Sequence, residues 1–403
     1  MLKKLKSKCS ICFFIMTLFM TACGKDNTTT ENNSYNDVEK VGYYYSVLND
    51  YTKNSDGKLN KSNGTYISYF DYESKTSVPL CSNINCNHYN HGCNSYFDEN
   101  QCLGGMFYDY NGRIYMIERT DQKDVLVSYD KYGQNKNNEL ELSSEKQYVG
   151  YNGAFKKSMS RLFKDKLFFV RYNNDDKGSI VNLTICYVDM QKKDKVNEVG
   201  EIQVFKNQRG EIVKFIENSN NIYLLTQQSQ TSNTTDRKRE CYKINIGEHK
   251  LENIIKCSST EFSSIVKGDT YYWLDETIID DDENLYFSSW EFTREISNVS
   301  SDGEYVLNKF NTSNSTNQII YVLNHNNNVV GPSGLKLKGM DSQYIYLDFK
   351  YNSNSENQSE ISVIENGNGI KIIDKQGNEV KTICFSVNYE RDLNYSQVSR
   401  HDY

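Results

Sequence analysis

Proline and alanine are nearly missing from this chain. Its 403 residues include only 2 Pro, and the only alanines are Ala22 and Ala154, so the strongest helix former is almost absent. By contrast the chain contains 32 Tyr, 18 Phe and 23 Gly, with many Asn, Ser and Thr between short apolar runs. This composition is typical of strands and turns. We therefore expect an all-β protein without a helical domain.

Short motifs that identify enzymes are missing as well. The sequence contains no Gly-x-Ser-x-Gly, no His-Glu-x-x-His and no phosphate-binding loop. Active sites of repeat proteins are assembled from distant segments, so these absences favour a non-catalytic protein without excluding an enzyme. We predict no catalytic and no cofactor-binding residue from the sequence.

The N-terminus carries a targeting pattern. Four lysines and no acid precede the apolar run ICFFIMTLFM, and Thr21, Ala22 and Cys23 follow it. The run is too short to cross a bilayer as a permanent helix, whereas a signal peptide has this form. We predict a signal peptide at residues 1–22 and a flexible tether at 23–39, which is polar and lacks apolar periodicity.

The segment Met20-Thr21-Ala22-Cys23 resembles the lipobox of bacterial lipoprotein signal peptides, although Met stands where Leu is usual. The resemblance implies that cleavage makes Cys23 the N-terminus and that its thiol carries diacylglycerol, with palmitate among the acyl chains. Two acyl chains give stable anchoring. The alternative is an ordinary secretory signal that ends near a cysteine. We expect a lipid-anchored protein on the extracytoplasmic side of the cell membrane.

The charge of the mature chain limits its partners. Removal of four lysines from 46 basic residues leaves 42 against 53 acidic ones, a formal charge of about −11. This balance disfavours nucleic acid as a partner. It also leaves membrane attachment to the lipid, because no basic surface would assist it.

An aromatic strand pattern recurs six times. The copies are VGYYYSV at 41, NGRIYMI at 111, KDKLFFV at 164, NSNNIYLL at 218, DDENLYFSS at 281 and DSQYIYLDF at 341. We expect a second strand after each, ending in an Asx residue and a turn, at Asp71, Asp130, Asp189, Asn245, Asn324 and Asp374. The intervals of 59, 59, 56, 79 and 50 residues indicate one insertion and one contraction. Some units then close with a third strand that ends on Cys81, Cys257 or Cys384.

Six such units predict a six-bladed β-propeller over residues 40–390, followed by a tail at 391–403. One antiparallel sheet of about 50 residues cannot bury both of its faces alone, so neighbouring sheets must stack. A β-sandwich and an open solenoid are the alternatives. Residues 290–316 could hold a large loop or part of a seventh blade.

The cysteine-rich insertion at residues 81–102 is the sharpest candidate site. It contains Cys81, Cys86, His88, Cys93 and Cys102, between the first and second units. Thiolates and imidazoles are zinc ligands, so four of these side chains could hold a structural zinc. Four cysteines of an exported domain could equally form two disulfides, and unpaired thiols are a third possibility.

The phrase SYFDYESKTSVPLCSNINCNHYNHGCNSYF resembles a signature of lipoproteins from Gram-positive anaerobes, some of them known only as domains of unknown function. In that signature a strand runs into a Cys, then Cys-x-His, then a Cys followed by a small residue and an aromatic. Ser95 stands where Ala is expected. The resemblance implies a membrane-anchored extracytoplasmic propeller and supplies no activity.

The remaining candidates have structural interpretations. We interpret the acidic run Asp280–Glu283 as a turn between two blades, with calcium binding as the alternative. We interpret Trp273 and Trp290 as core residues rather than as part of a carbohydrate-binding surface. We expect a binding or scaffold module without catalysis, whose ligand is a protein, peptide or glycan. The alternative is a propeller-fold polysaccharide lyase or glycosidase.

Overall fold

A computed structural model of the chain describes residues 42–53, 59–71, 76–81, 83, 85–86, 93, 95–98, 107–119, 123–144, 147–149, 159–174, 180–204, 213–229, 237–266, 273–292, 303–324, 335–353 and 365–385. The predicted signal peptide, tether and C-terminal tail lie outside this set. Within it, none of the helices is both long and apolar enough to cross a bilayer.

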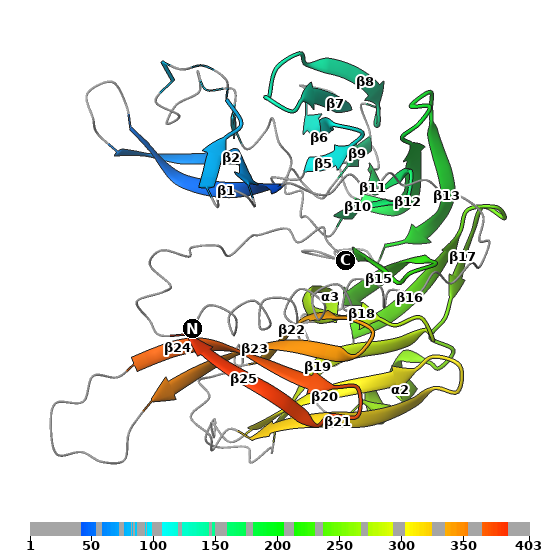
Figure 1. Cartoon of the computed structure of the whole chain (residues 1–403). Helices are drawn as coiled ribbons and strands as arrows, with labels where there is room; N and C mark the ends of the chain where they lie inside the picture. The colour runs from blue at the N-terminus through cyan, green and yellow to red at the C-terminus, as the bar shows by residue number, and fades with distance from the viewer. Residues whose placement is uncertain are drawn as a thin grey trace, which may run out of the picture. The chain divides into compact units, whose positions relative to one another are not determined.

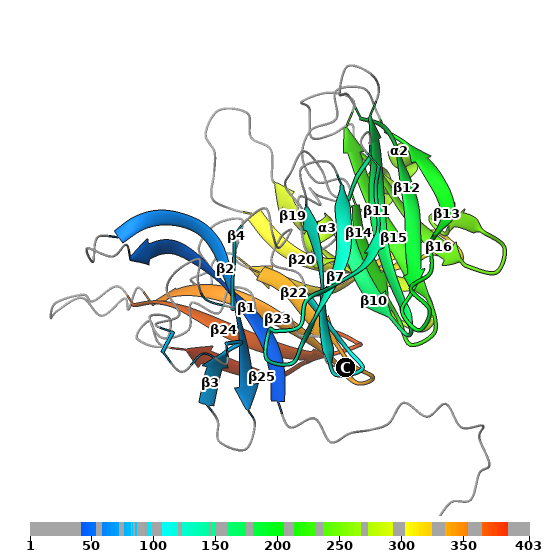
Figure 2. The same ribbon diagram turned by 90° about the horizontal axis from the view of Figure 1, so that it is seen from above.

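Six antiparallel sheets follow one another along the chain, as the colours of Figures 1 and 2 show. Blade one contains β1 (Gly42–Lys53), β2 (Leu59–Asp71), β3 (Thr76–Pro79) and β4 (Tyr96–Asp98). Blade two contains β5 (Phe107–Tyr110), β6 (Arg113–Arg119), β7 (Asp124–Asp130) and β8 (Asn137–Glu141). Blade three contains β9 (Gln147–Val149), β10 (Ser160–Phe163), β11 (Lys166–Asn174), β12 (Ile180–Asp189) and β13 (Val196–Gln203).

The second half of the chain repeats this arrangement. Blade four contains β14 (Val213–Glu217), β15 (Ile222–Ser229), β16 (Arg237–Asn245) and β17 (Lys250–Asn253). Blade five contains β18 (Ile278–Ile279), β19 (Asn284–Phe292), β20 (Gly303–Asn311) and β21 (Thr316–Asn324). Blade six contains β22 (Leu335–Met340), β23 (Tyr344–Ser353), β24 (Glu365–Asp374) and β25 (Glu379–Phe385). The chain is therefore all-β with the predicted six-bladed β-propeller fold, and the described residues form no seventh sheet.

The aromatic strands of blades two to six occupy the middle of their sheets, whereas the aromatic strand of blade one, β1, lies at an edge. In blades two to six a short strand precedes the aromatic one, so that β6, β11, β15, β19 and β23 each pair on both sides. Their side chains fill the core, and Phe168, Tyr223 and Phe287 are completely buried. Five of the six aromatic copies are thus these central strands, and the repeat did not reveal the short strands that precede them.

Asx residues end the strands as predicted. The Asp374 carboxylate accepts hydrogen bonds from the backbone N–H groups of Gln376 and Asn378, at 2.9 and 2.8 Å, and from the Asn378 side chain. These donors hold the pKa of the Asp374 carboxyl below its usual value. Asp130 in blade two accepts from Tyr132 and Gln134 in the same way.

Blade five corrects one predicted position. The strand that follows the aromatic strand β19 is β20, and it ends at Asn311. The Asn311 side chain accepts hydrogen bonds from the N–H groups of Ser313 and Asn314. Asn324 ends β21, the next strand. With Asn311 in the series the last two intervals become 66 and 63 residues, so the predicted insertion and contraction disappear. Residues 303–316 accordingly belong to blade five and not to a seventh blade. β21 carries the apolar run Ile319–Leu323 followed directly by an Asn, as expected of the strand after the aromatic one, which explains the error.

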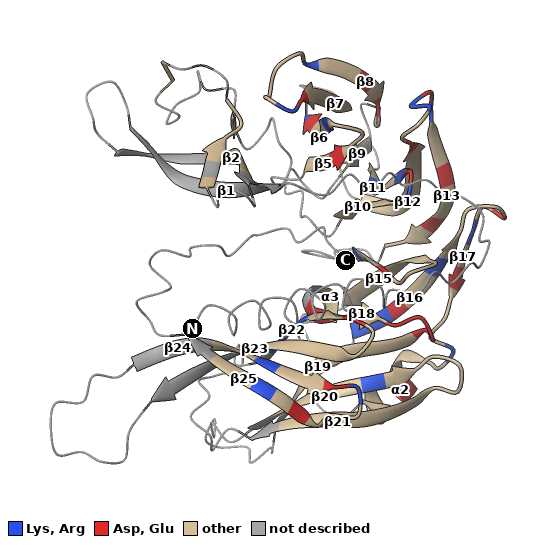
Figure 3. Cartoon of the chain, in the orientation of Figure 1, with Lys and Arg blue, Asp and Glu red and all other residues tan. Residues whose placement is uncertain are grey.

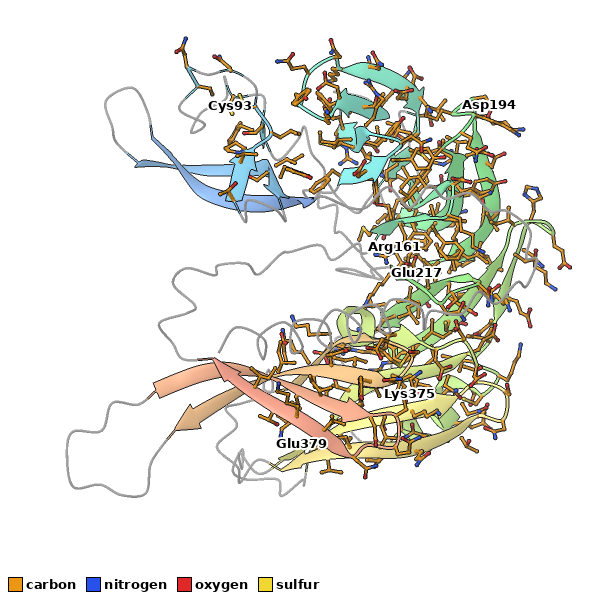
Figure 4. The ribbon with its side chains drawn as sticks, viewed as in Figure 1. Cys93, Arg161, Asp194, Glu217, Lys375 and Glu379 are labelled. Carbon is orange, nitrogen blue, oxygen red and sulfur yellow. The ribbon has the colours of Figure 1, made fainter. Side chains whose placement is uncertain are left out.

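Polar contacts join consecutive blades. Tyr110 donates to Asp165 at 2.9 Å between blades two and three, and Arg161 pairs with Glu217 at 2.7 Å between blades three and four. Figure 4 labels Arg161 and Glu217, which lie next to each other. Both sides of this ion pair are partly exposed. Along the described strands, positive and negative side chains are interspersed rather than gathered by sign (Figure 3).

Two short helices connect blades four and five. α2 (Ser259–Ile265) begins with a capping box, in which Ser258 and Glu261 each accept the other's backbone N–H. α3 (Trp273–Glu276) follows. Trp273 is completely buried, donates its Nε1–H to the carbonyl of Thr226 at 3.2 Å, and stacks edge-on with Phe262. Trp273 is therefore core, as expected, while the side chain of Trp290 lies outside the described set.

Candidate functional site

Three of the five side chains predicted for the cysteine-rich insertion come together. The sulfur atoms of Cys81, Cys86 and Cys93, which we call the cysteine cluster, all lie within 4.8 Å of one another. Cys93 is only 3% exposed, whereas Cys81 and Cys86 are partly exposed. Figure 4 labels Cys93 at its place in blade one. The geometry gives one buried and two accessible ligands around a common point.

The remaining predicted site residues are outside the described set. His88 and Cys102 belong to the insertion, and Cys23 belongs to the predicted lipid anchor. Three mutually close sulfurs can make at most one disulfide among themselves, so the predicted pair of disulfides would need Cys102. A tetrahedral metal would similarly need one further ligand beside the cysteine cluster.

The base of the insertion is tied to one residue of β2. The backbone N–H of Leu80, just before the first cysteine, donates to the carbonyl of Ile67 at 2.8 Å. The N–H of Ile67 donates in turn to the carbonyl of Ser95 at 2.9 Å. Ile67 is completely buried and packs with Leu80 against blade two. Both arms of the insertion therefore leave the same point of the blade core.

Tight turns hold the cysteines close to this base. The N–H of Cys86 donates to the carbonyl of Asn83 at 3.1 Å, and the N–H of Tyr96 donates to the carbonyl of Cys93 at 3.0 Å. Asn is a preferred residue in such turns because its side chain caps nearby N–H groups, as that of Asn83 does for Asn85. The turn at Asn83 thus brings Cys86 back toward the base of the insertion.

β4 returns the insertion to blade one. Tyr96 pairs with Tyr66, and residues 97 and 98 pair with 65 and 64, so β4 extends the edge of β2 beyond β3. Tyr96 is the aromatic residue that ends the lipoprotein-like signature, and it lies in β4. The insertion therefore contains a strand of blade one and is not only a loop between two blades.

The electrostatics of the cysteine cluster favour protonated thiols or a bound cation. Burial raises the pKa of the Cys93 thiol to about 11, and the thiols of Cys86 and Cys81 add to the rise. The hydrogen bond between the Ser95 hydroxyl and Cys93 Sγ, at 2.9 Å, and the one that the Ser95 N–H donates to the same sulfur, at 3.4 Å, lower this pKa. A divalent cation among three sulfurs supplies the positive charge that thiolates need in such a place. The cysteine cluster could therefore hold a metal ion.

The acidic run is an interblade turn, as predicted. Asp281 accepts from both the N–H and the hydroxyl of Ser219 in blade four, each at 2.9 Å. Glu283 accepts from Tyr223 at 2.8 Å and from the Lys243 ammonium group at 2.6 Å. These acids connect blade five to blade four, and their oxygens point to protein donors rather than to a common calcium position.

A polar hollow on blade five was not anticipated. Its volume is about 470 Å³, and its lining residues are Asp282, Asn284, Lys309, Asn311, Thr316, Asn317 and Gln318. All of these carry amide, hydroxyl or charged groups, which suit a ligand bound by hydrogen bonds. They come from the ends of β19, β20 and β21, and their spacing is recognisable only once Asn311 is known to end β20.

Two of the other cysteines are core residues. Cys186 on β12 and Cys241 on β16 are completely buried, as expected, and burial raises the pKa of each thiol. Cys257 lies beyond the end of β17, whereas Cys384 lies within β25. The strand-ending cysteines of the sequence pattern are therefore not equivalent in structure.

Neither a protein-family model nor a curated protein sequence matches this chain. Among solved structures, an uncharacterized protein from Listeria monocytogenes is 10% identical with a TM-score of 0.40, over 71% of this chain and 65% of its own length, just under two thirds. Oligogalacturonate lyase from Vibrio parahaemolyticus is 8% identical with a TM-score of 0.41, over 85% and 78% of the two chains. The β-propeller domain of the Trilobed protease from Pyrococcus furiosus is 10% identical with a TM-score of 0.39, over 85% and 83%. The fold assignment rests on the six sheets and not on these likenesses.

Proposed function

We propose that the chain is a membrane-anchored extracytoplasmic lipoprotein whose propeller serves as a binding or scaffold module without catalytic activity. The observation that carries the proposal is the segment Met20–Cys23 behind a cationic start and a short apolar run. Diacylglycerol on Cys23 holds the mature chain at the membrane, and residues 24–39 separate the propeller from the lipid surface.

The ligand of this module is a hydroxyl-rich or amide-rich molecule, such as a glycan or a peptide. The polar hollow of blade five supports this, because it offers a carboxylate acceptor at Asp282 and an ammonium donor at Lys309 beside several amides. The net negative charge of the mature chain supports a partner other than nucleic acid.

The anchoring is tested by a Cys23→Ala variant expressed in a host that processes lipoproteins. Wild type is expected in the membrane fraction and labelled by radioactive palmitate, and the variant is expected to lose both properties. Cys12→Ala is the matched control, because it removes a cysteine of the same signal segment and leaves Cys23 intact. Membrane retention of the Cys23→Ala variant would refute the lipid anchor.

The lack of catalysis is tested by incubating the purified protein with cell-envelope polysaccharides and acidic plant polysaccharides. No new reducing ends and no unsaturated uronates are expected. Release of either product would establish the lyase or glycosidase alternative in place of the binding module.

We propose further that the cysteine cluster holds a structural zinc ion. A tetrahedral zinc with Zn–S distances of about 2.3 Å places its sulfurs about 3.8 Å apart, which is within the spacing that the cluster provides. His88 and Cys102 are the candidates for the remaining ligand. Metal analysis of the protein as purified from the envelope is expected to give one zinc per chain, and disulfides found by mass spectrometry without reductant would contradict it.

A further inference from the structure

The sulfur of Cys93, the buried member of the cysteine cluster, has a hydroxyl group beside it. The Ser95 side chain is completely buried, and its Oγ lies 2.9 Å from Cys93 Sγ. The Ser95 backbone N–H also donates to the same sulfur, at 3.4 Å. A thiolate can only accept hydrogen bonds, so the hydroxyl must be the donor whenever Cys93 is deprotonated.

Ser95 also touches the blade through its other end. Its carbonyl accepts the N–H of Ile67 at 2.9 Å, and the next residue, Tyr96, begins β4 and pairs with Tyr66. One residue therefore contacts the sulfur of the candidate metal ligand on one side and β2 on the other. Cys93, the candidate metal ligand, precedes Tyr96, the first paired residue of β4, by only three residues. The position of one therefore restricts the position of the other.

We propose that Ser95 is a positioning residue of this metal site, through which a thiolate-bound metal fixes the pairing of β4 with β2. The inference rests on the proposed zinc at the cysteine cluster and deepens it. Donors that contact a ligating atom orient it, and their loss typically weakens metal binding by about 10- to 100-fold. Because Ser95 holds Cys93 Sγ and Ile67 together, metal binding and strand pairing stabilise each other.

The test compares the zinc affinity of the full chain, purified in detergent, with that of two variants. Ser95→Ala removes the hydroxyl and keeps both backbone contacts. Ser160→Ala is the matched control, because it removes another buried seryl hydroxyl, which bonds to Tyr108 in a different part of the propeller. Affinity is read by competition with a chromophoric chelator at fixed pH, with zinc as the only added metal.

Zinc affinity is expected to fall about 10- to 100-fold in Ser95→Ala and by less than about twofold in Ser160→Ala. Both variants are expected to keep one site per chain. Equal affinities of wild type and Ser95→Ala would overturn the role of Ser95 and leave the zinc proposal standing. A wild-type chain that binds no zinc would overturn both, whereas the membrane fractionation of the Cys23 variant is independent of either result.

Hydrogen exchange supplies a readout that loss of a buried hydroxyl alone does not move. In wild type, zinc is expected to slow hydrogen exchange in a peptide covering residues 64–68. This peptide contains Ile67 and the three residues of β2 that pair with β4. In Ser95→Ala at saturating zinc, this protection is expected to be weaker. Zinc without effect on this peptide in wild type would overturn the coupling of metal binding to strand pairing.

Discussion

Replacement of Gly377 by alanine tests the packing of successive blades. Gly377 lies in the turn between β24 and β25, with a φ of 91°, and its N–H donates to the carbonyl of Asp374. A Cβ on this residue would overlap the backbone carbonyl oxygen of Ile320 in blade five. Since a backbone atom cannot rotate away, the turn of blade six must move off its neighbour.

Two other glycines separate the contributions to the loss. Gly112 has a φ of 72°, and a Cβ there would meet nothing within 4 Å, so Gly112→Ala is expected to cost only the left-handed strain of about 1–2 kcal/mol. Gly133 has a φ of 73°, and its Cβ would lie 2.7 Å from the carbonyl oxygen of Leu80 in blade one. We expect an added overpacking cost of roughly 1–3 kcal/mol for Gly133→Ala, and at least as much for Gly377→Ala.

The assay is urea unfolding of each alanine variant, followed by far-ultraviolet circular dichroism. The free energy of unfolding is expected to fall in the order wild type, Gly112→Ala, Gly133→Ala, Gly377→Ala, with unchanged dependence on urea concentration. Equal losses at Gly112 and Gly377 would show that the turn of blade six does not pack on Ile320, and would refute the described stacking of blades five and six.

Two further predictions concern the turns and the core. The pKa of Asp374 is lowered from 3.8 by the Asn378 donors, so its contribution to stability is present above pH 4 and is lost as the pH falls through the lowered pKa. The urea midpoint of wild type is therefore expected to drop between pH 6 and pH 3 by more than that of Asp374→Asn, and parallel curves would contradict this. Trp273→Phe leaves the carbonyl of Thr226 without its indole donor, so we expect a loss of about 1–3 kcal/mol in urea unfolding, and an unchanged midpoint would contradict the buried hydrogen bond.

The sequence predicted the parts of the fold that follow from local chemistry. Aromatic residues mark the central strands because those strands are buried on both faces, and Asp130 and Asp374 mark turns because a carboxylate caps several N–H groups there. The position of Asn324 was wrong because the edge strand β21 has an apolar run that ends in Asn, like the strand expected after the aromatic one. Only the strand pairing distinguishes the two. The helix α2 was missed although Ser258 and Glu261 form a capping box that the sequence displays.

The sequence predicted where the candidate site lies, but not which of its side chains contact one another. Cysteine spacing identified the insertion, but spacing does not show which sulfurs meet, because that depends on turns such as the one at Asn83. In the sequence, Ser95 differs from the lipoprotein-like signature only in standing where Ala is expected. Its contacts with Cys93 and Ile67 depend on the return of the chain along β2, which no local pattern reveals.

The intact mass of the protein, measured under native conditions after release from the cell envelope, tests the account most directly. We expect a chain that begins at Cys23, carries the added mass of diacylglycerol, and retains one zinc that is lost on acidification. A chain without lipid would contradict the membrane-anchored lipoprotein. A metal-free chain, lighter by the hydrogens that disulfide formation removes, would contradict the zinc site in the cysteine cluster.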